Sequence, residues 1–202
     1  MERTAKRRPI LILTVVAATL MVTSGLALAA TLHGTKGNDA IVGTARADTM
    51  RGLAGDDAIR GRGGADTVYG GDGVDHVRGG RGNDDLEGGE DSDVMKGGAG
   101  GDIVYGGSGN DTLYGGSGRD VVEGGSGNDR LYGGSADDGV VDYDGNNILT
   151  GGSGRDRIFV GSGTNHVNAI DGNEDFICVE DPETTTIERD PEQDRVYEGT
   201  CV

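Results

Sequence analysis

The chain has 202 residues, of which 41 are glycine, two are phenylalanine and none is tryptophan, and hydrophobic residues make up 34%. This composition excludes an ordinary globular core for a chain of this length. The formal net charge of −17 is typical of a disordered chain. It also argues against nucleic acid as a partner, because the phosphates would be repelled.

The first 29 residues have the features of a secretory signal peptide. Four basic residues lie within positions 3–8, residues 10–22 are apolar, and Ala27-Leu28-Ala29 is a small-residue cleavage motif. Cleavage would remove four basic residues and one acidic residue, which changes the net charge from −17 to −20. The alternative is an uncleaved anchor, because the apolar stretch is long enough to span a bilayer. We therefore expect a secreted protein without a stable membrane span after cleavage, or a cell-surface protein if the leader is retained.

Sixteen consecutive nine-residue repeats extend from Gly34 to Ile177. A fixed period of this kind predicts stacked structural units instead of a single folded core. The eighth position of every repeat is apolar, from Ile41 to Phe176. One apolar residue in nine predicts a short strand in each unit, and stacking of the units would line these side chains into one buried ridge.

The sixth position of the repeat is aspartate in thirteen repeats, and Asn147, Asn165 and Glu174 take its place in the others. Strands stack about 4.8 Å apart, so a ladder of ionised carboxylates would repel unless cations lay between its members. Glycine at positions one, two and four permits positive φ and tight turns whose carbonyls point inward. Carboxylate and carbonyl oxygens in flexible geometry favour calcium over magnesium. The sequence therefore predicts several bound Ca²⁺ ions.

Seven repeats carry the complete hexad Gly-Gly-x-Gly-x-Asp, namely those that contain Asp75, Asp84, Asp102, Asp111, Asp120, Asp129 and Asp156. These residues resemble the repeats-in-toxin (RTX), or hemolysin-type, calcium-binding family, whose nonapeptide is G-G-x-G-x-D-x-U-x. The resemblance covers 144 of the 202 residues. It implies an all-β, right-handed parallel β-roll of about eight coils, in which two nonapeptides make one 18-residue coil and calcium lies between stacked turns.

On that reading the metal ligands fall into two rows, with Asp156 as a further candidate. The first edge holds Asp57, Asp75, Asp93, Asp111 and Asp129. The second edge holds Asp66, Asp84, Asp102, Asp120 and Asp138. Departures from the pattern put the first two turns and the last few in doubt as metal sites: Arg46, Asp91 and Ala136 at position four, and Asn147, Asn165 and Glu174 at position six. Because calcium neutralises the rows, we expect the chain to fold when it binds the metal.

The stacking of alternate repeats also predicts a row on the outer surface. Position nine would bring together Arg60, Arg78, Lys96, Tyr114 and Tyr132. Like charges at strand spacing repel one another, so this row is a candidate face for an anionic polysaccharide or another surface component. The alternative is that the bases only balance the neighbouring acidic edges.

The segment 178–202 follows the repeats and contains both cysteines of the chain, Cys178 and Cys201. An even pair in an exported protein predicts a disulfide, which would tie this tail over the open end of the roll as a cap. The alternative is a frayed tail with two free thiols.

The chain carries no HExxH, GxSxG, GxGxxG or P-loop motif, and the tail is too short for a catalytic domain. We therefore expect a secreted calcium-binding protein with a structural or surface-interaction role, and no enzyme. One alternative is an accessory folding or secretion partner, or a non-catalytic component, of a separate secreted hydrolase. A more remote alternative is an ice or glycan binder that uses flat outer rows of Ser108, Asn110, Ser126 and Asn128.

Overall fold

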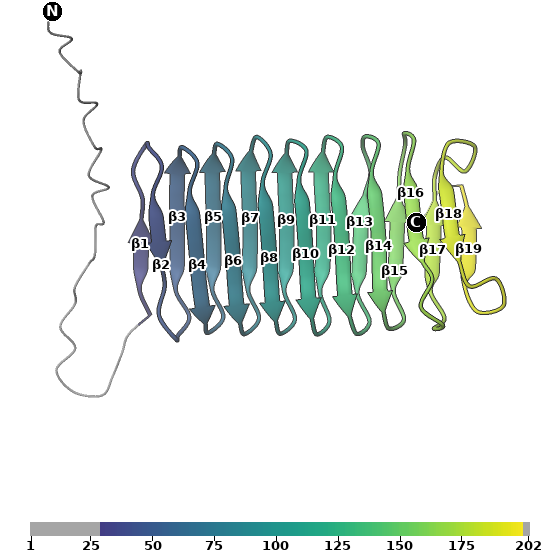
Figure 1. Cartoon of the computed structure of the whole chain (residues 1–202), viewed down its shortest axis with the longest axis horizontal. Coiled ribbons are helices and arrows are strands. Elements are labelled where there is room, and N and C mark those ends of the chain that lie inside the picture. Colours follow the sequence, from purple (N-terminus) through teal and green to yellow (C-terminus); the bar gives the residue numbers. More distant parts are fainter. Residues whose placement is uncertain (1–28, 200–202) are drawn as a thin grey trace, which may run out of the picture.

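The computed structural model describes residues 29–199. Within this range the chain forms nineteen strands in two parallel sheets, and consecutive strands alternate between the sheets (Figure 1). Among the described residues there is no helix long and apolar enough to cross a membrane. The all-β parallel solenoid that the resemblance implied is confirmed, with about nine coils in place of eight.

The two sheets contain the odd-numbered and the even-numbered strands. The ten-stranded sheet runs β1 (Thr31–His33), β3 (Thr49–Ala54), β5 (Thr67–Asp72), β7 (Asp85–Glu90), β9 (Ile103–Ser108), β11 (Val121–Ser126), β13 (Gly139–Asp142), β15 (Arg157–Val160), β17 (Phe176–Val179) and β19 (Arg195–Glu198). The nine-stranded sheet runs β2 (Ala40–Val42), β4 (Ala58–Gly63), β6 (His76–Arg81), β8 (Val94–Ala99), β10 (Thr112–Ser117), β12 (Arg130–Ser135), β14 (Ile148–Ser153), β16 (His166–Ala169) and β18 (Thr186–Arg189).

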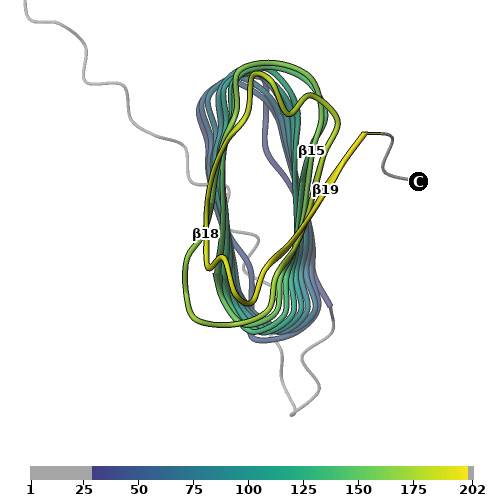
Figure 2. The same cartoon turned by 90° about the vertical axis from the view of Figure 1, so that its right-hand side faces the viewer.

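The register of the sheets shows how the repeat builds the core. Leu113 of β10 pairs with Leu131 of β12, and Val104 of β9 pairs with Val122 of β11, each 18 residues further on. All four side chains are fully buried. Viewed end-on, the two sheets form the long sides of a flattened coil that short turns close at both edges (Figure 2). The apolar ridge therefore fills the space between the sheets, and each coil depends mainly on its two neighbours.

The glycines of the repeat have two different roles. At positions two and four they adopt positive φ, as at Gly116 (123°) and Gly118 (111°), which confirms the predicted turn geometry. Position one differs, because Gly115 is not among the residues with positive φ. A Cβ at Gly115 would lie 2.6 Å from the carbonyl oxygen of Gly133 and 2.7 Å from the Cβ of Asp120. At Gly115 glycine is required for space and not for positive φ, so the predicted role of this position in backbone conformation was wrong.

The repeat frame slips by one residue before β17. β15 pairs with β17 so that Ile158 lies beside Ile177, and Ile177, not Phe176, is the fully buried residue. The ring of Phe176 lies on the outside, 4.7 Å between centroids from the ring of Tyr197 and 5.8 Å from that of Phe159. The prediction of an unbroken frame to the last repeat was wrong at this coil, because the loop before β17 contains one extra residue.

The strands continue into the predicted tail. β18 pairs with β16 and β19 pairs with β17, both in parallel, so the chain up to Glu198 adds to the solenoid. Cys178 lies on β17 with 4% of its surface exposed. Cys201 lies outside the described residues, and so do residues 1–28, which make up nearly all of the expected signal peptide. The disulfide, and with it a disulfide-tied cap, is therefore not shown and stays a prediction.

Candidate metal centre

The position-six aspartates form a hydrogen-bonded row along each edge of the solenoid. The backbone N–H of Asp93 donates to Oδ1 of Asp111, and that of Asp111 donates to Oδ1 of Asp129, both at 2.8 Å. On the other edge Asp102 donates to Asp120 at 2.7 Å in the same way. The structure thus brings all eleven candidate aspartates into the two rows. Their carboxylates are buried, with at most 3% of each residue exposed.

The second carboxylate oxygen of these residues has no hydrogen-bond donor. The atoms concerned are Oδ2 of Asp57, Asp66, Asp75, Asp84, Asp93, Asp102, Asp111, Asp120, Asp129, Asp138, Asp142, Asp156 and Asp175. A Cβ on Gly106 would contact both Oδ2 of Asp111 and the carbonyl oxygen of Gly124, so these two oxygens line the same small space. Acceptors therefore face acceptors in a buried space, which costs free energy unless a cation or a proton lies between them. The residues fit calcium, which takes carboxylate and carbonyl oxygens.

The buried position also changes the acidity of the rows. Burial is the largest cause in each case, and the charges of neighbouring aspartates add to it at most of these positions. It raises the pKa from 3.8 to about 6 for Asp66, Asp75, Asp102, Asp111 and Asp156. It raises the pKa to about 7 for Asp93, Asp138 and Asp175, and to about 8 for Asp142. Ionised rows at neutral pH are therefore unfavourable without a compensating cation.

The asparagines at position six show how a turn is closed without a charge. Nδ2 of Asn165 donates to the carbonyls of Gly161, Ser162 and Gly163 at 3.2–3.4 Å. Nδ2 of Asn147 donates to the carbonyl of Asp144 at 3.2 Å. The amide supplies donors that a carboxylate lacks, so these turns do not need a cation at this atom.

The first turns and the last one satisfy their carboxylates in another way. Oδ2 of Asp48 accepts the backbone N–H of Thr44 at 2.5 Å, and Asp39 accepts that of Thr35. Oδ2 of Asp194 accepts the N–H of Asp190 at 2.7 Å. The unpartnered oxygens are therefore concentrated in the middle coils, where the repeat pattern is most complete.

Two residues with unpartnered oxygens were missed by sequence reasoning. Asp175 takes position six of the last repeat because of the frame slip, whereas Glu174 is exposed and its Oε1 lies 2.6 Å from Nη2 of Arg195. The change from Glu174 to Asp175 could have been found by shifting the frame until Ile177 fell on the apolar position. Asp142 lies at position one, where an acidic residue in place of glycine was a visible signal.

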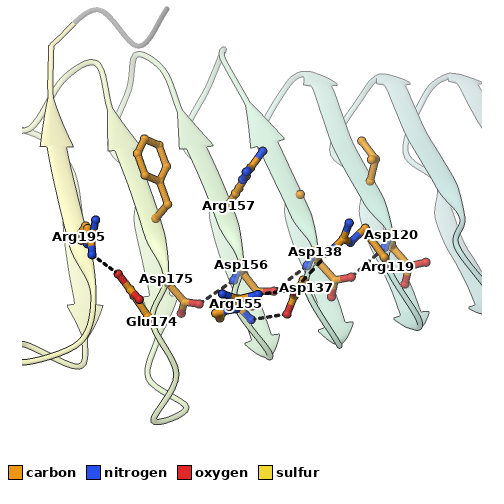
Figure 3. Close-up of a pocket in the computed structure, with 13 residues that line it drawn as sticks. Arg119, Asp120, Asp137, Asp138, Arg155, Asp156, Arg157, Glu174, Asp175 and Arg195 are labelled. Atoms are coloured by element: carbon orange, nitrogen blue, oxygen red, sulfur yellow. Dashed lines mark hydrogen bonds and ion pairs between the residues drawn. The ribbon is translucent and has the colours of Figure 1, made fainter.

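A groove of ≈ 530 Å³ lies along the second row near the carboxyl-terminal end. Figure 3 shows its aspartates in a line along the edge, beside a cluster of exposed ion pairs. Oδ2 of Asp137 lies 3.2 Å from Nη2 of Arg119 and 3.4 Å from Nη2 of Arg155, and the N–H of Arg155 with both guanidinium groups lowers the pKa of Asp137. The nearby arginines thus neutralise the exposed acids of the groove, which leaves the buried row without a charge partner.

The predicted outer row is present on the nine-stranded sheet, and we call it the basic–aromatic row. Its members are paired in register on successive strands, in the order Arg60, Arg78, Lys96, Tyr114 and Tyr132. Nζ of Lys96 lies 4.6 Å from the centroid of the Tyr114 ring, which stacks on Tyr132 at 4.8 Å. A second groove, of ≈ 430 Å³, lies between the side chains at the basic end of the row. Within residues 29–199 none of the three bases forms an ion pair.

Comparison with known families gives the same assignment as the geometry. The sequence model of the RTX calcium-binding nonapeptide repeat, built of four repeat copies, matches residues 33–68, 42–77, 69–104, 105–140 and 132–167. The chain belongs to the RTX calcium-binding nonapeptide repeat family. RTX repeats bind several calcium ions, so calcium is the ligand of this RTX chain. The two aspartate rows contain carboxylate oxygens of the kind that calcium takes. A search of curated proteins finds no match.

Proposed function

We propose that this RTX protein is a secreted calcium-binding structural protein, without catalytic activity of its own, that folds when it meets calcium outside the cell. The observation that carries the proposal is the set of thirteen buried Oδ2 atoms without a donor. Ions that bind these atoms in the fold but not in the unfolded chain stabilise the fold by mass action. Extracellular calcium modules commonly bind at about 10⁻⁴ to 10⁻³ M, so a low-calcium compartment would leave the chain unfolded.

The position of the predicted cleavage motif supports export. The motif ends at Ala29, and β1 begins at Thr31. The N–H of Ala30 donates to Oδ1 of Asp48 at 2.7 Å, so the solenoid begins directly after the motif. Removal of the leader would leave every described strand intact.

The test is to express the full chain in a secreting host and to measure the mass of the product in the medium. We expect a species that begins at residue 30 and resists protease in calcium, but is digested in chelator with or without added magnesium. A product that stays inside the cell with its leader, or that resists protease equally in chelator, would contradict the proposal.

The proposed disulfide would close the end of the solenoid. Cys178 pairs in register with Tyr197 of β19, and Cys201 follows Tyr197 by four residues. This separation allows the chain to turn back after β19 and reach the outer face of β17. Mass spectrometry of a digest without reductant would show the linked peptides, whereas two alkylated cysteines would exclude the bond.

We also propose a partner for the basic–aromatic row, an anionic polysaccharide. Unpaired bases at strand spacing repel, which a row of sulfate or carboxylate groups would relieve. The rings of Tyr114 and Tyr132 stack on each other and Lys96 lies over the Tyr114 ring, so these side chains add apolar area beside the bases. The groove at Arg60 and Arg78 is also lined by His76 and by two acids, Asp56 and Asp57.

Binding to immobilised dextran sulfate and to neutral dextran, both in saturating calcium, tests this partner. We expect the wild type to bind only the sulfated polymer, and the double variant R60Q/R78Q to lose most of that binding. The matched control, R51Q/R157Q, removes the same charge from the opposite sheet and should bind as the wild type does. Equal loss in both double variants would contradict a specific row.

The described residues favour neither of the two alternatives, a hydrolase accessory or an ice or glycan binder with flat rows. The amide oxygen of Asn110 accepts the N–H of Asn128 at 2.8 Å, and that of Asn128 accepts the N–H of Asn146 at 2.8 Å. These side chains join successive coils and are already engaged.

A further inference from the structure

Asp142 is an inward-pointing acid at position one, where most repeats have glycine and the other exceptions, Val160 and Ala169, are apolar. It ends β13 and has 1% of its surface exposed. Its Oδ1 accepts the backbone N–H of Asp144 at 3.2 Å, and its Oδ2 has no donor. A buried carboxylate oxygen without a partner is costly, so this replacement of glycine calls for a compensating interaction.

The carboxylate of Asp142 lies against the turn of the preceding coil. A Cβ on Gly124 would clash with Oδ2 of Asp142 and would lie 2.5 Å from Oδ2 of Asp129. The two carboxylate oxygens therefore lie on the same side of Gly124. In the preceding coil the nearest atoms to a Cβ on Gly106 are Oδ2 of a single aspartate, Asp111, and the carbonyl oxygen of Gly124. The turn of Asp129 therefore holds one more carboxylate than its neighbour in the row.

The same row loses a carboxylate one coil later. Asn147 accepts the N–H of Asp129 at Oδ1, at 2.8 Å, as an aspartate would, but its side chain carries no charge. Asp142 lies five residues before Asn147, in the same coil. Beyond it, Asn165 closes its own turn through Nδ2. The loss of charge at one position thus coincides with a gain at another position that faces the same turn.

We propose that Asp142 and Asp129 hold a calcium ion at the end of this row, with Asp142 replacing the carboxylate that Asn147 lacks. The site falls outside the repeat pattern, which assigns calcium to position six only. It rests on the proposed calcium-dependent fold, and it adds a chain-specific site that terminates the row on this edge.

The test measures the number of bound calcium ions by isothermal titration calorimetry. D142N keeps the size of the side chain and removes its charge, and we expect it to bind one ion fewer than the wild type. The matched control is D144N, which removes the same charge from an exposed side chain two residues away and should keep the full number. The double variant D142G/N147D returns both positions to the repeat pattern and should restore the lost ion.

The outcomes separate this site from the proposed function. A wild type that binds no calcium would refute the proposed function itself. A wild type that binds calcium, together with D142N of unchanged stoichiometry and affinity, would overturn the Asp142 site alone. If D142N does not fold in calcium, D142G/N147D decides: wild-type stoichiometry supports the compensation, and a missing ion refutes it.

Discussion

The backbone N–H of Asp93 donates to Oδ1 of Asp111, one coil further along the solenoid, at 2.8 Å. This bond fixes one oxygen of the carboxylate on the neighbouring coil and leaves the other directed into the turn without a donor. Repetition of the bond along both edges places the free oxygens at the spacing of the strands. The backbone therefore holds the rows in place, and each row keeps buried oxygens of the kind that calcium takes.

The aspartates of the middle coils should matter more for calcium than those of the first coils. D111A removes an oxygen without a donor, whereas D48A removes one that already accepts the N–H of Thr44. We expect D111A to bind at least one ion fewer and to need several-fold more calcium for half-maximal folding, with little change for D48A. Calorimetry with both variants checks this, and an equal loss of stoichiometry would contradict the ranking.

Acid should partly replace calcium. Burial raises the pKa of Asp93 and Asp138 to about 7 and that of Asp75 to about 6, from 3.8. A pKa raised in the fold gives stability that is fully present below the unfolded value and is lost as pH rises through the folded value. In chelator we therefore expect β-structure near pH 4–5 that disappears between about pH 6 and 8.

Circular dichroism in chelator across this pH range tests that expectation, and the same series in saturating calcium is the control, which should change little above pH 6. A chain in chelator that is most structured at pH 8 would contradict the assigned direction.

The conversion of Asn165 to aspartate should make its turn depend on calcium. N165D removes the amide donors to three carbonyls and adds a buried charge. Loss of a net hydrogen bond costs about 1 kcal/mol, so in limiting calcium we expect destabilisation by about 1–3 kcal/mol. Denaturant unfolding measures it, with the exposed variant N146D as the control. N165D that is as stable as the wild type at low calcium would show that the amide is not required.

Much of the fold and of the candidate site was predictable from the period together with the RTX resemblance. Because the apolar and acidic positions recur every nine residues, stacked strands, a buried apolar ridge and a ladder of aspartates follow from the sequence. The 18-residue coil, which divides the aspartates into two rows and builds the basic–aromatic row, was implied by the resemblance. The unbroken period gives no sign of the extra residue before β17, since Phe176 and Ile177 are both apolar and both fit the pattern. The one signal is that a shifted frame also brings Asp175 to position six in place of Glu174. The contact of Asp142 with the turn of Asp129 depends on which way a position-one side chain points, and only the fold shows that it points inward.

If the disulfide forms, its reduction should destabilise the carboxyl-terminal end of the solenoid first. In a model-dependent entropy estimate a bond that closes a loop of this length contributes about 3 kcal/mol. Reduction should then increase hydrogen exchange at Ile177 and afterwards at Leu149, with Val104 protected, because solenoid units depend on their neighbours. Exchange in calcium with and without reductant measures this, and uniform loss of protection along the solenoid would contradict an end effect.

The central claim is that calcium closes the buried carboxylate rows and so folds the chain. Far-ultraviolet circular dichroism of the leaderless chain during a calcium titration from chelator to about 10 mM tests it most directly. We predict a largely unfolded spectrum in chelator and a cooperative gain of β-structure with calcium, which magnesium does not reproduce. Identical β-rich spectra in chelator and in calcium would contradict the claim.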